Sequence, residues 1–144
     1  MTYATQQDLV ARFGTAELAQ LTDPAAGAVI DAAVVARALA DASAEIDTRL
    51  AARYALPLAA VPAVLVRVAA DVARYYLWDA RATEQVRNRY KDAAALLDKI
   101  GSGAVQLPGA AVLAAAAGAV AVAARSPARQ FGTALLDAFS PAQP

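Results

Sequence analysis

The acidic side chains best placed for acid–base chemistry lie close together in the first half of the chain. Asp41, Glu45 and Asp47 are the carboxylates there, and a pair of carboxylates can act as general acid and general base. In a helix, Asp41 and Glu45 share a face while Asp47 points well away from both. Arg49 and Arg53 follow closely and are suited to form structural ion pairs with them. We therefore expect a structural role for these acids, and we predict that the chain is not an enzyme.

The composition removes most other routes to catalysis. The chain contains neither cysteine nor histidine. It therefore lacks disulfides, zinc–thiolate sites and thiol nucleophiles, as well as the commonest general base and the commonest metal ligand. The sequence also lacks the motifs G-x-x-x-x-G-K-[ST], G-x-G-x-x-G and H-E-x-x-H and the EF-hand calcium loop. We expect no cofactor and no bound metal.

The charge balance argues against nucleic acid and membrane partners. The 144 residues include 13 basic and 13 acidic side chains, well mixed along the chain, so the formal net charge is zero. No basic surface for duplex DNA or an anionic membrane is therefore expected. The longest apolar run, Ala110–Ala124, is mostly alanine and is shorter than the roughly 20 residues that a membrane span needs. The N-terminus lacks the features of a secretory signal, which predicts a protein that stays in the cytoplasm where it is made.

The abundance of alanine, with few β-branched and aromatic residues in the first hundred positions, predicts an all-α fold. Thr5 and Asp8 have the spacing of a capping box for a helix over residues 6–13. A shorter helix is expected over residues 16–21, with Thr15 as the residue that opens it. These two short helices precede the main body of the bundle.

Two long antiparallel helices, joined by a proline elbow, are predicted to form the centre of a small helical bundle. The first begins after Asp31, because apolar residues recur along one helical face to about Tyr54: Val35, Leu39, Ala42, Ile46, Leu50 and Tyr54. Pro57 and Pro62 cannot continue a helix, so the chain turns there. The second helix begins at or just after Pro62 and is expected to be the central one, since it carries Val64, Leu65, Val68, Val72, Tyr75, Tyr76 and Leu77.

A third helix is predicted after a break over residues 79–82. Thr83 and Glu84 begin it, and Gly101 is expected to close it. An apolar stripe at helical spacing supports this assignment, with Val86, Tyr90, Ala94, Leu97 and Ile100 as its members. Residues 1–101 are thus expected to form one helical body.

Residues 102–144 are predicted to form an extended tail rich in Ala, Gly and Pro. Short strands are expected over residues 104–107, which precede a turn at Pro108–Gly109, and over residues 119–122. Such pieces bury too little apolar area to offset the entropy lost when they are ordered. The tail therefore needs a neighbour.

Two groups of residues are candidates for contacts with other chains. Near the C-terminus, large apolar side chains return on one face of a short helix that either folds back on the body or docks on another subunit, namely Phe131, Leu135, Leu136 and Phe139. On one side of the second long helix, arginines recur every seven residues, at Arg67, Arg74 and Arg81. Trp78 belongs to the aromatic cluster beside them. The arginines face either solvent or acidic groups of a neighbouring copy. The aromatic side chains pack either between helices or at a subunit interface.

Several short motifs occur in a characteristic order. They are T-Q-Q-D-L-V-A-R-F-G, A-L-A-D-A-S-A-E-I-D-T-R-L-A-A-R-Y-A-L-P-L, D-V-A-R-Y-Y-L-W-D, R-N-R-Y-K-D-A, I-G-S-G before L-P-G, and R-Q-F-G. In this combination the sequence resembles the Mu-like phage family of small head-tail connector proteins. The likeness covers almost the whole chain except the alanine-rich piece around residues 110–124.

The resemblance implies a structural virion protein in the neck, present in the host cytoplasm during assembly. Copies would form a homo-oligomeric ring of twelve between the portal protein and the tail. A tail terminator or another neck or tail protein would be a further partner, and DNA would only pass through. By the same analogy, portal docking falls on Arg125, Arg129, Phe131, Leu135, Leu136 and Phe139. The alternatives are a tail-completion (terminator) protein of the same virion and a small helical regulatory or nucleic-acid-binding module.

Overall fold

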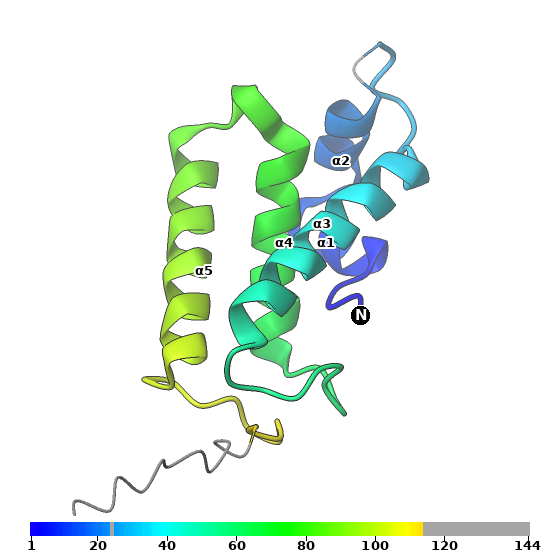
Figure 1. Cartoon of the computed structure of the whole chain (residues 1–144). Helices are drawn as coiled ribbons and strands as arrows, with labels where there is room; N and C mark the ends of the chain where they lie inside the picture. Colours follow the sequence, from blue (N-terminus) through cyan, green and yellow to red (C-terminus); the bar gives the residue numbers. More distant parts are fainter. Residues whose placement is uncertain (24, 114–144) are drawn as a thin grey trace, which may run out of the picture.

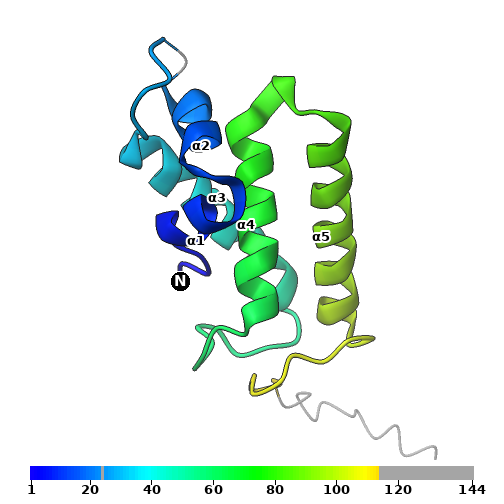
Figure 2. The same ribbon diagram turned by 180° about the vertical axis from the view of Figure 1, so that it is seen from behind.

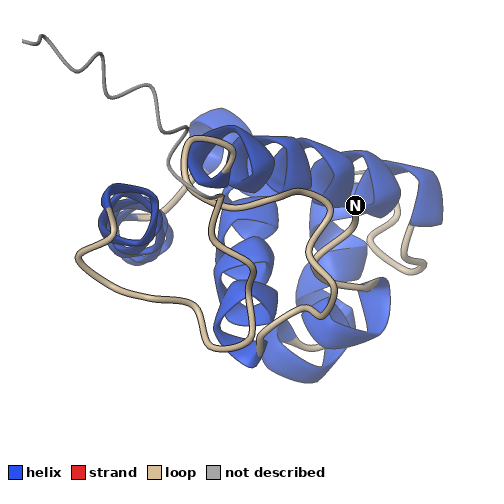
Figure 3. Cartoon of the chain, turned by 60° about the horizontal axis from the view of Figure 1, so that its bottom comes forward, coloured by secondary structure: helices blue, strands red, loops and turns tan. Residues whose placement is uncertain are grey.

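The computed structural model describes residues 1–23 and 25–113, which form five α-helices and one 3-10 helix (Figure 1). In chain order they are α1 (Gln6–Phe13), α2 (Thr15–Thr22), α3 (Ala32–Leu50), α4 (Ala63–Trp78), η1 (Asp79–Arg81) and α5 (Glu84–Ser102). This part of the chain contains no strand, and Figure 3 accordingly draws it as helices and loops only. The predicted all-α fold is confirmed for the described residues.

Helix α4 is the centre of the bundle. Among the described residues it contacts each of the other four helices. Views from opposite sides place α5 along one flank of α4 and the short helices α1 and α2 near the other (Figures 1 and 2). Half of its 16 residues are buried, namely Leu65, Val68, Ala69, Ala70, Asp71, Val72, Ala73 and Leu77. The central position predicted for this helix is confirmed, whereas its antiparallel arrangement with α3 stays a prediction.

The N-terminal helices begin and end much as their residue types indicate. The Thr5 hydroxyl oxygen accepts the Asp8 amide at 3.3 Å, and the Asp8 carboxylate accepts the Thr5 amide at 2.8 Å. The Thr5 hydroxyl and amide bonds lower the pKa of this exposed carboxyl. Gly14, at φ 85°, ends α1 and also caps α2. Thr15 is therefore the first residue of α2, which corrects its predicted role as the cap.

Helix α3 ends at Leu50, four residues before the predicted end at Tyr54. The apolar face was identified correctly, since all six of its predicted members are buried. Tyr54 reaches the core from a turn instead, and its hydroxyl oxygen accepts the amide of Leu107 at 3.1 Å. Beyond Leu50 the backbone turns, and residues 53–55 pair with residues 111–113, a long-range contact that a periodicity argument cannot detect.

The beginning of the predicted tail lies against the body. The Ala55 amide donates to the carbonyl of Ala111 at 3.1 Å, and the Leu113 amide donates to the carbonyl of Arg53 at 2.8 Å. Between them Tyr54 and Val112 form an isolated antiparallel bridge. The neighbour that this stretch requires is thus the loop that follows α3 in the same chain.

The strand predicted over residues 104–107 is absent, because the chain bends there and buries Leu107 instead. The turn at Pro108–Gly109 is present. The second predicted strand, 119–122, lies outside the described residues. The division of the chain at residue 101 stays a prediction.

Helix α5 continues through Gly101 to Ser102, and Gly103 closes it in the left-handed conformation at φ 87°. Gly101 therefore does not end the helix, as the sequence predicted, but allows a close contact with α3. A Cβ atom at this position would lie 2.6 Å from the carbonyl oxygen of Arg49 on α3. Because glycine has no side chain, α5 can pack at Gly101 directly against the backbone of α3 at Arg49, near the C-terminal ends of both helices.

Glu45 of α3 connects the three long helices. Its carboxylate accepts the Tyr76 hydroxyl of α4 at 2.6 Å and the Tyr90 hydroxyl of α5 at 3.1 Å. Arg49 donates to the same group at 2.7 Å, as the predicted ion pair requires, and the Glu45 side chain is 14% exposed. The ring of Tyr90 stacks on Tyr75 with 4.2 Å between centroids. A single carboxylate thus fixes the register of α3, α4 and α5.

We expect Gly101→Ala to lower stability by about 1–3 kcal/mol, because the added methyl group meets the Arg49 carbonyl. At an exposed helical position the same change raises stability by up to about 1 kcal/mol. The sign of the change in the free energy of unfolding therefore identifies the close contact. Urea unfolding measures it. The reverse change at exposed Ala95 of α5, Ala95→Gly, is the matched control and should cost about 0.5–1 kcal/mol. A higher urea midpoint for Gly101→Ala would contradict the packing described.

We also expect stability to fall as the pH rises above about 10. Burial, followed by interaction with the Glu45 carboxylate, raises the pKa of Tyr76 and of Tyr90. A pKa that is higher in the folded chain means that folding favours the neutral phenol. The resulting contribution to stability is complete below the ordinary tyrosine pKa and is lost as the pH rises through the higher pKa of the folded chain. Absorbance at 295 nm and urea midpoints across this range measure the effect. Tyr76→Phe should weaken the pH dependence, whereas Tyr75→Phe, which keeps the stacked ring, should preserve it; equal slopes for both would count against the network.

Candidate interaction sites

Glu17 of α2 holds α4 through a bidentate ion pair. Its carboxylate accepts Arg74 Nε at 2.6 Å and Arg74 Nη2 at 2.9 Å. The Trp78 indole N–H donates to the same carboxylate at 3.2 Å. The Arg74 guanidinium also lies 4.5 Å from the centroid of the Phe13 ring, within cation–π distance. With Arg74 only 13% exposed, this group of four side chains attaches α1 and α2 to the central helix.

The four residues predicted for subunit contacts therefore fall into two groups in the structure. Arg74 and Trp78 have a partner in their own chain, while Arg67 of α4 and Arg81 of η1 are exposed. Seven-residue spacing places side chains on one side of a helix but does not say what covers each turn of it. The inter-subunit role of all four residues stays a prediction, with Arg67 and Arg81 the more accessible pair.

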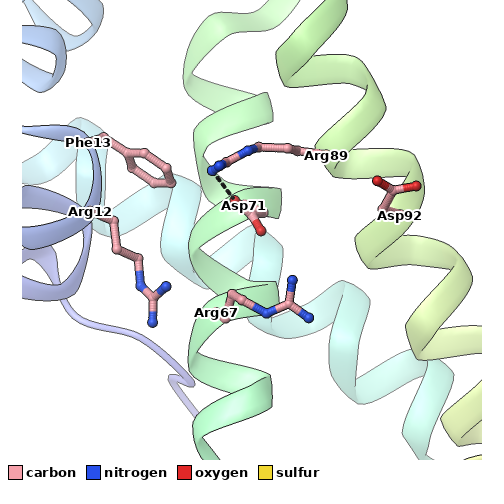
Figure 4. A pocket seen from close by; sticks show the side chains of 6 residues that line it. All are labelled: Arg12, Phe13, Arg67, Asp71, Arg89 and Asp92. Atoms are coloured by element: carbon pink, nitrogen blue, oxygen red, sulfur yellow. Dashed lines mark hydrogen bonds and ion pairs between the residues drawn. The ribbon is translucent and has the colours of Figure 1, made fainter.

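A polar cleft opens between α1, α4 and α5, and Figure 4 shows the side chains around it. It has a volume of about 430 Å³ and is lined by Arg12, Phe13, Arg67, Asp71, Arg89 and Asp92. Arg89 reaches from α5 toward α4, where its Nη1 lies 3.5 Å from Oδ1 of Asp71. The Asp71 side chain is 9% exposed, so a carboxylate lies at the base of an otherwise arginine-rich cleft.

Sequence reasoning identified Arg67 but missed the rest of this cleft. The available signal was Asp71, a single acid within the most apolar helix and four residues after Arg67. An acid at such a position is either buried with a partner or lies at a functional surface. Its observed partner, Arg89, comes from a different helix, so only the tertiary structure could supply it.

Of the three acids first considered for catalysis, Glu45 and Asp47 have structural partners, whereas Asp41 is exposed and forms no ion pair of 4 Å or less with a described residue. Glu45 belongs to the network of Tyr76, Tyr90 and Arg49, and Arg49 continues to Asp98 of α5 at 2.8 Å. Asp47 accepts the hydroxyl of Tyr3, whose pKa is raised mainly by burial. The N-terminal ammonium lies 3.7 Å from the other oxygen of Asp47. Through these contacts Asp47 attaches the N-terminal segment to α3, and Glu45 with Arg49 attaches α5 to α3.

The remaining expectations concern metals, membranes and docking. Within the described ranges no three acidic side chains are arranged to hold a metal ion. None of the helices described is both long and apolar enough to cross a membrane. The residues predicted for portal docking lie outside the described part of the chain, namely Arg125, Arg129, Phe131, Leu135, Leu136 and Phe139.

We expect Glu17→Gln to destabilise the chain by roughly 1–3 kcal/mol, because it leaves the largely buried Arg74 guanidinium without its anion. Trp78 is the only tryptophan, so its fluorescence reports directly on the loss of the indole contact. The exposed first-turn acid of α5 provides a matched control, and Glu84→Gln should leave both emission and urea midpoint close to those of the parent. Unchanged emission and stability in Glu17→Gln would show that the ion pair is dispensable.

The comparison with known proteins matches most of the chain. The family described as "Bacteriophage Mu, Gp36" matches residues 3–124, a range that includes all five helices. The "Mu-like prophage FluMu protein gp36" of Haemophilus influenzae is 43% identical over 105 residues, covering 73% of this chain and 74% of that protein. "Gene product J" of Escherichia phage Mu is 45% identical over 104 residues, covering 72% of this chain and 74% of that protein.

These matches confirm the expectation of a Mu-like phage protein, although neither relative's name states a connector role. The matched range covers both the Glu17 ion pair and the arginine-rich cleft. The chain belongs to the phage protein family described as Bacteriophage Mu, Gp36.

Proposed function

We propose that this chain is a non-enzymatic head-tail connector of a Mu-like phage or prophage. In this role its copies form a ring, with twelve as the expected number, between the portal protein and the tail. The observation that carries the proposal is the family relationship with a phage Mu gene product and a prophage gp36 protein, together with the ordered motifs that resemble small connectors. The location that follows is the virion neck, with the host cytoplasm as the site of assembly.

The organisation of the helical body supports a structural role. Glu17, Glu45 and Asp47 each bond to groups from other parts of the chain, so these acids hold helices together. A connector subunit must keep its shape while its surfaces contact several neighbours, and a body cross-linked by such contacts meets this need. The heterologous contacts of a closed ring require two different faces of the same subunit. The exposed arginines, Arg67 and Arg81, are the proposed contribution of α4 and η1 to one of them.

Portal docking is proposed for the segment that contains Phe131, Leu135, Leu136 and Phe139. Large apolar side chains return there after a stretch dominated by alanine and glycine, and Arg125 and Arg129 precede them. Residues 111–113, the last that the structure describes, are held against residues 53–55. Docking through an apolar segment is a recurrent mode of peptide recognition between proteins.

Deleting residues 126–144 is expected to leave the helical body folded and to abolish capture by the portal protein of the same phage. Co-purification with the portal measures binding, and circular dichroism with urea unfolding measures the body. A full-length variant, Phe131→Ala with Leu135→Ala, should weaken capture, whereas Gln130→Ala, directly before Phe131, provides the matched control. Capture of the truncated chain at full strength would refute the docking assignment.

The same preparation separates the connector from its alternatives. A ring of copies bound to the portal is the outcome expected for a connector, visible by electron microscopy of the complex. Preferential binding to the tail-tube protein would indicate the tail-completion role instead. Salt-sensitive binding to duplex DNA would indicate the nucleic-acid-binding module.

A further inference from the structure

The cleft between α1, α4 and α5 contains more positive charge than its own acids neutralise. Three guanidinium groups line it, from Arg12, Arg67 and Arg89, against the two carboxylates of Asp71 and Asp92. Of the three, Arg89 reaches a carboxylate, at 3.5 Å from Asp71. Within the described residues no ion pair of 4 Å or less involves Arg12 or Arg67, although both are charged and exposed.

The location of Asp71 explains why the cleft is stable without a ligand. Its carboxylate is almost fully buried at the base, where it offsets part of the repulsion between the surrounding guanidinium groups. Arg89, Asp71 and Arg67 come from two adjacent helices and Arg12 comes from α1; in Figure 4 the Arg12 side chain runs downward on the α1 side, while that of Arg67 extends toward α5. Counted over its six lining residues, the cleft has one net positive charge without any partner.

That excess determines the class of ligand. A single carboxylate neutralises it, and the planar guanidinium group bonds to a carboxylate in a bidentate geometry. A phosphate with two charges exceeds the single positive charge in excess, and duplex DNA requires several basic contacts along a surface. The ring of Phe13 adds an apolar wall suited to the aliphatic part of a side chain. The volume, about 430 Å³, admits an acidic residue together with part of its neighbours.

We propose that this cleft is a binding site for an acidic side chain of another polypeptide, held by Arg12 and Arg67 with Phe13 against its aliphatic stem. Asp71 and Arg89, which pair with each other at 3.5 Å, line the rest of the cleft. The inference concerns a site on the helical body and stands apart from the portal-docking segment, so either can fail without the other. It also assigns a function to Arg67, which is exposed on α4.

The test uses the full chain and a blocked pentapeptide, acetyl-Gly-Leu-Glu-Leu-Gly-amide, whose only charge is the glutamate carboxylate. In NMR titrations we expect saturable shifts of the side-chain Nε resonances of Arg12 and Arg67. The same peptide with glutamine should cause none. Arg12→Gln combined with Arg67→Gln should weaken binding at least about tenfold, since both charge-assisted bonds are lost. Both positions are exposed, so the fold is expected to survive, and a urea midpoint verifies this.

A matched control is Arg37→Gln, an exposed arginine of α3 that lines a different groove beside Asp41. It should bind the glutamate peptide as the parent does. Equal shifts with the glutamine peptide, or equal loss of binding in Arg37→Gln, would overturn the proposal. Stronger shifts of the same resonances with inorganic phosphate or a 12-base-pair duplex would also overturn it and would assign the cleft to phosphate groups instead.

Discussion

The constraint on which the rest of this structure depends is the apolar character of α4 around most of its circumference. A helix of this kind is unstable in water on any side, so it must be covered by other elements. Helices α3 and α5 cover much of it, and the short helices α1 and α2 cover the remainder. Small residues such as Ala69, Ala70 and Ala73 allow these neighbours to approach closely, which is why a chain so rich in alanine still forms a packed core.

The helices packed around α4 also enclose polar groups, and each of these groups organises a junction between helices. Glu45 bonds to α4 and α5, Glu17 fixes Arg74, and Asp71 lies beneath Arg89. Such pairs contribute little net stability over apolar substitutes, but leaving one partner alone is costly. They therefore specify which helix packs against which. This division suits a subunit whose shape must stay constant in an assembly: apolar burial supplies the stability, and a few carboxylates determine the arrangement.

The surfaces left after this packing are where a function in assembly would reside. The cleft lined by Arg12, Arg67 and Arg89 combines charge in excess with a preformed shape. Elsewhere, the pairing of residues 53–55 with residues 111–113 holds the last described residues against the body, and the proposed docking segment follows them in the sequence. One chain thus offers a rigid charged site and a separate apolar segment, which are two distinct means of contacting neighbours in a connector.

The sequence by itself determined that these helices form, some of their caps and the central position of α4, because these follow from local spacing: Thr5 with Asp8 at one end, Pro62 at another. It also determined which face of α3 is buried. The tertiary structure alone decided where α3 ends, why Gly101 is a glycine, and which arginine has a partner. Each of these depends on residues far apart in the chain, such as Tyr54 with Leu107 or Arg74 with Glu17, and such contacts leave no periodic signal in the sequence. The arginine-rich cleft belongs to the same class, since its side chains come from three helices that only folding brings together.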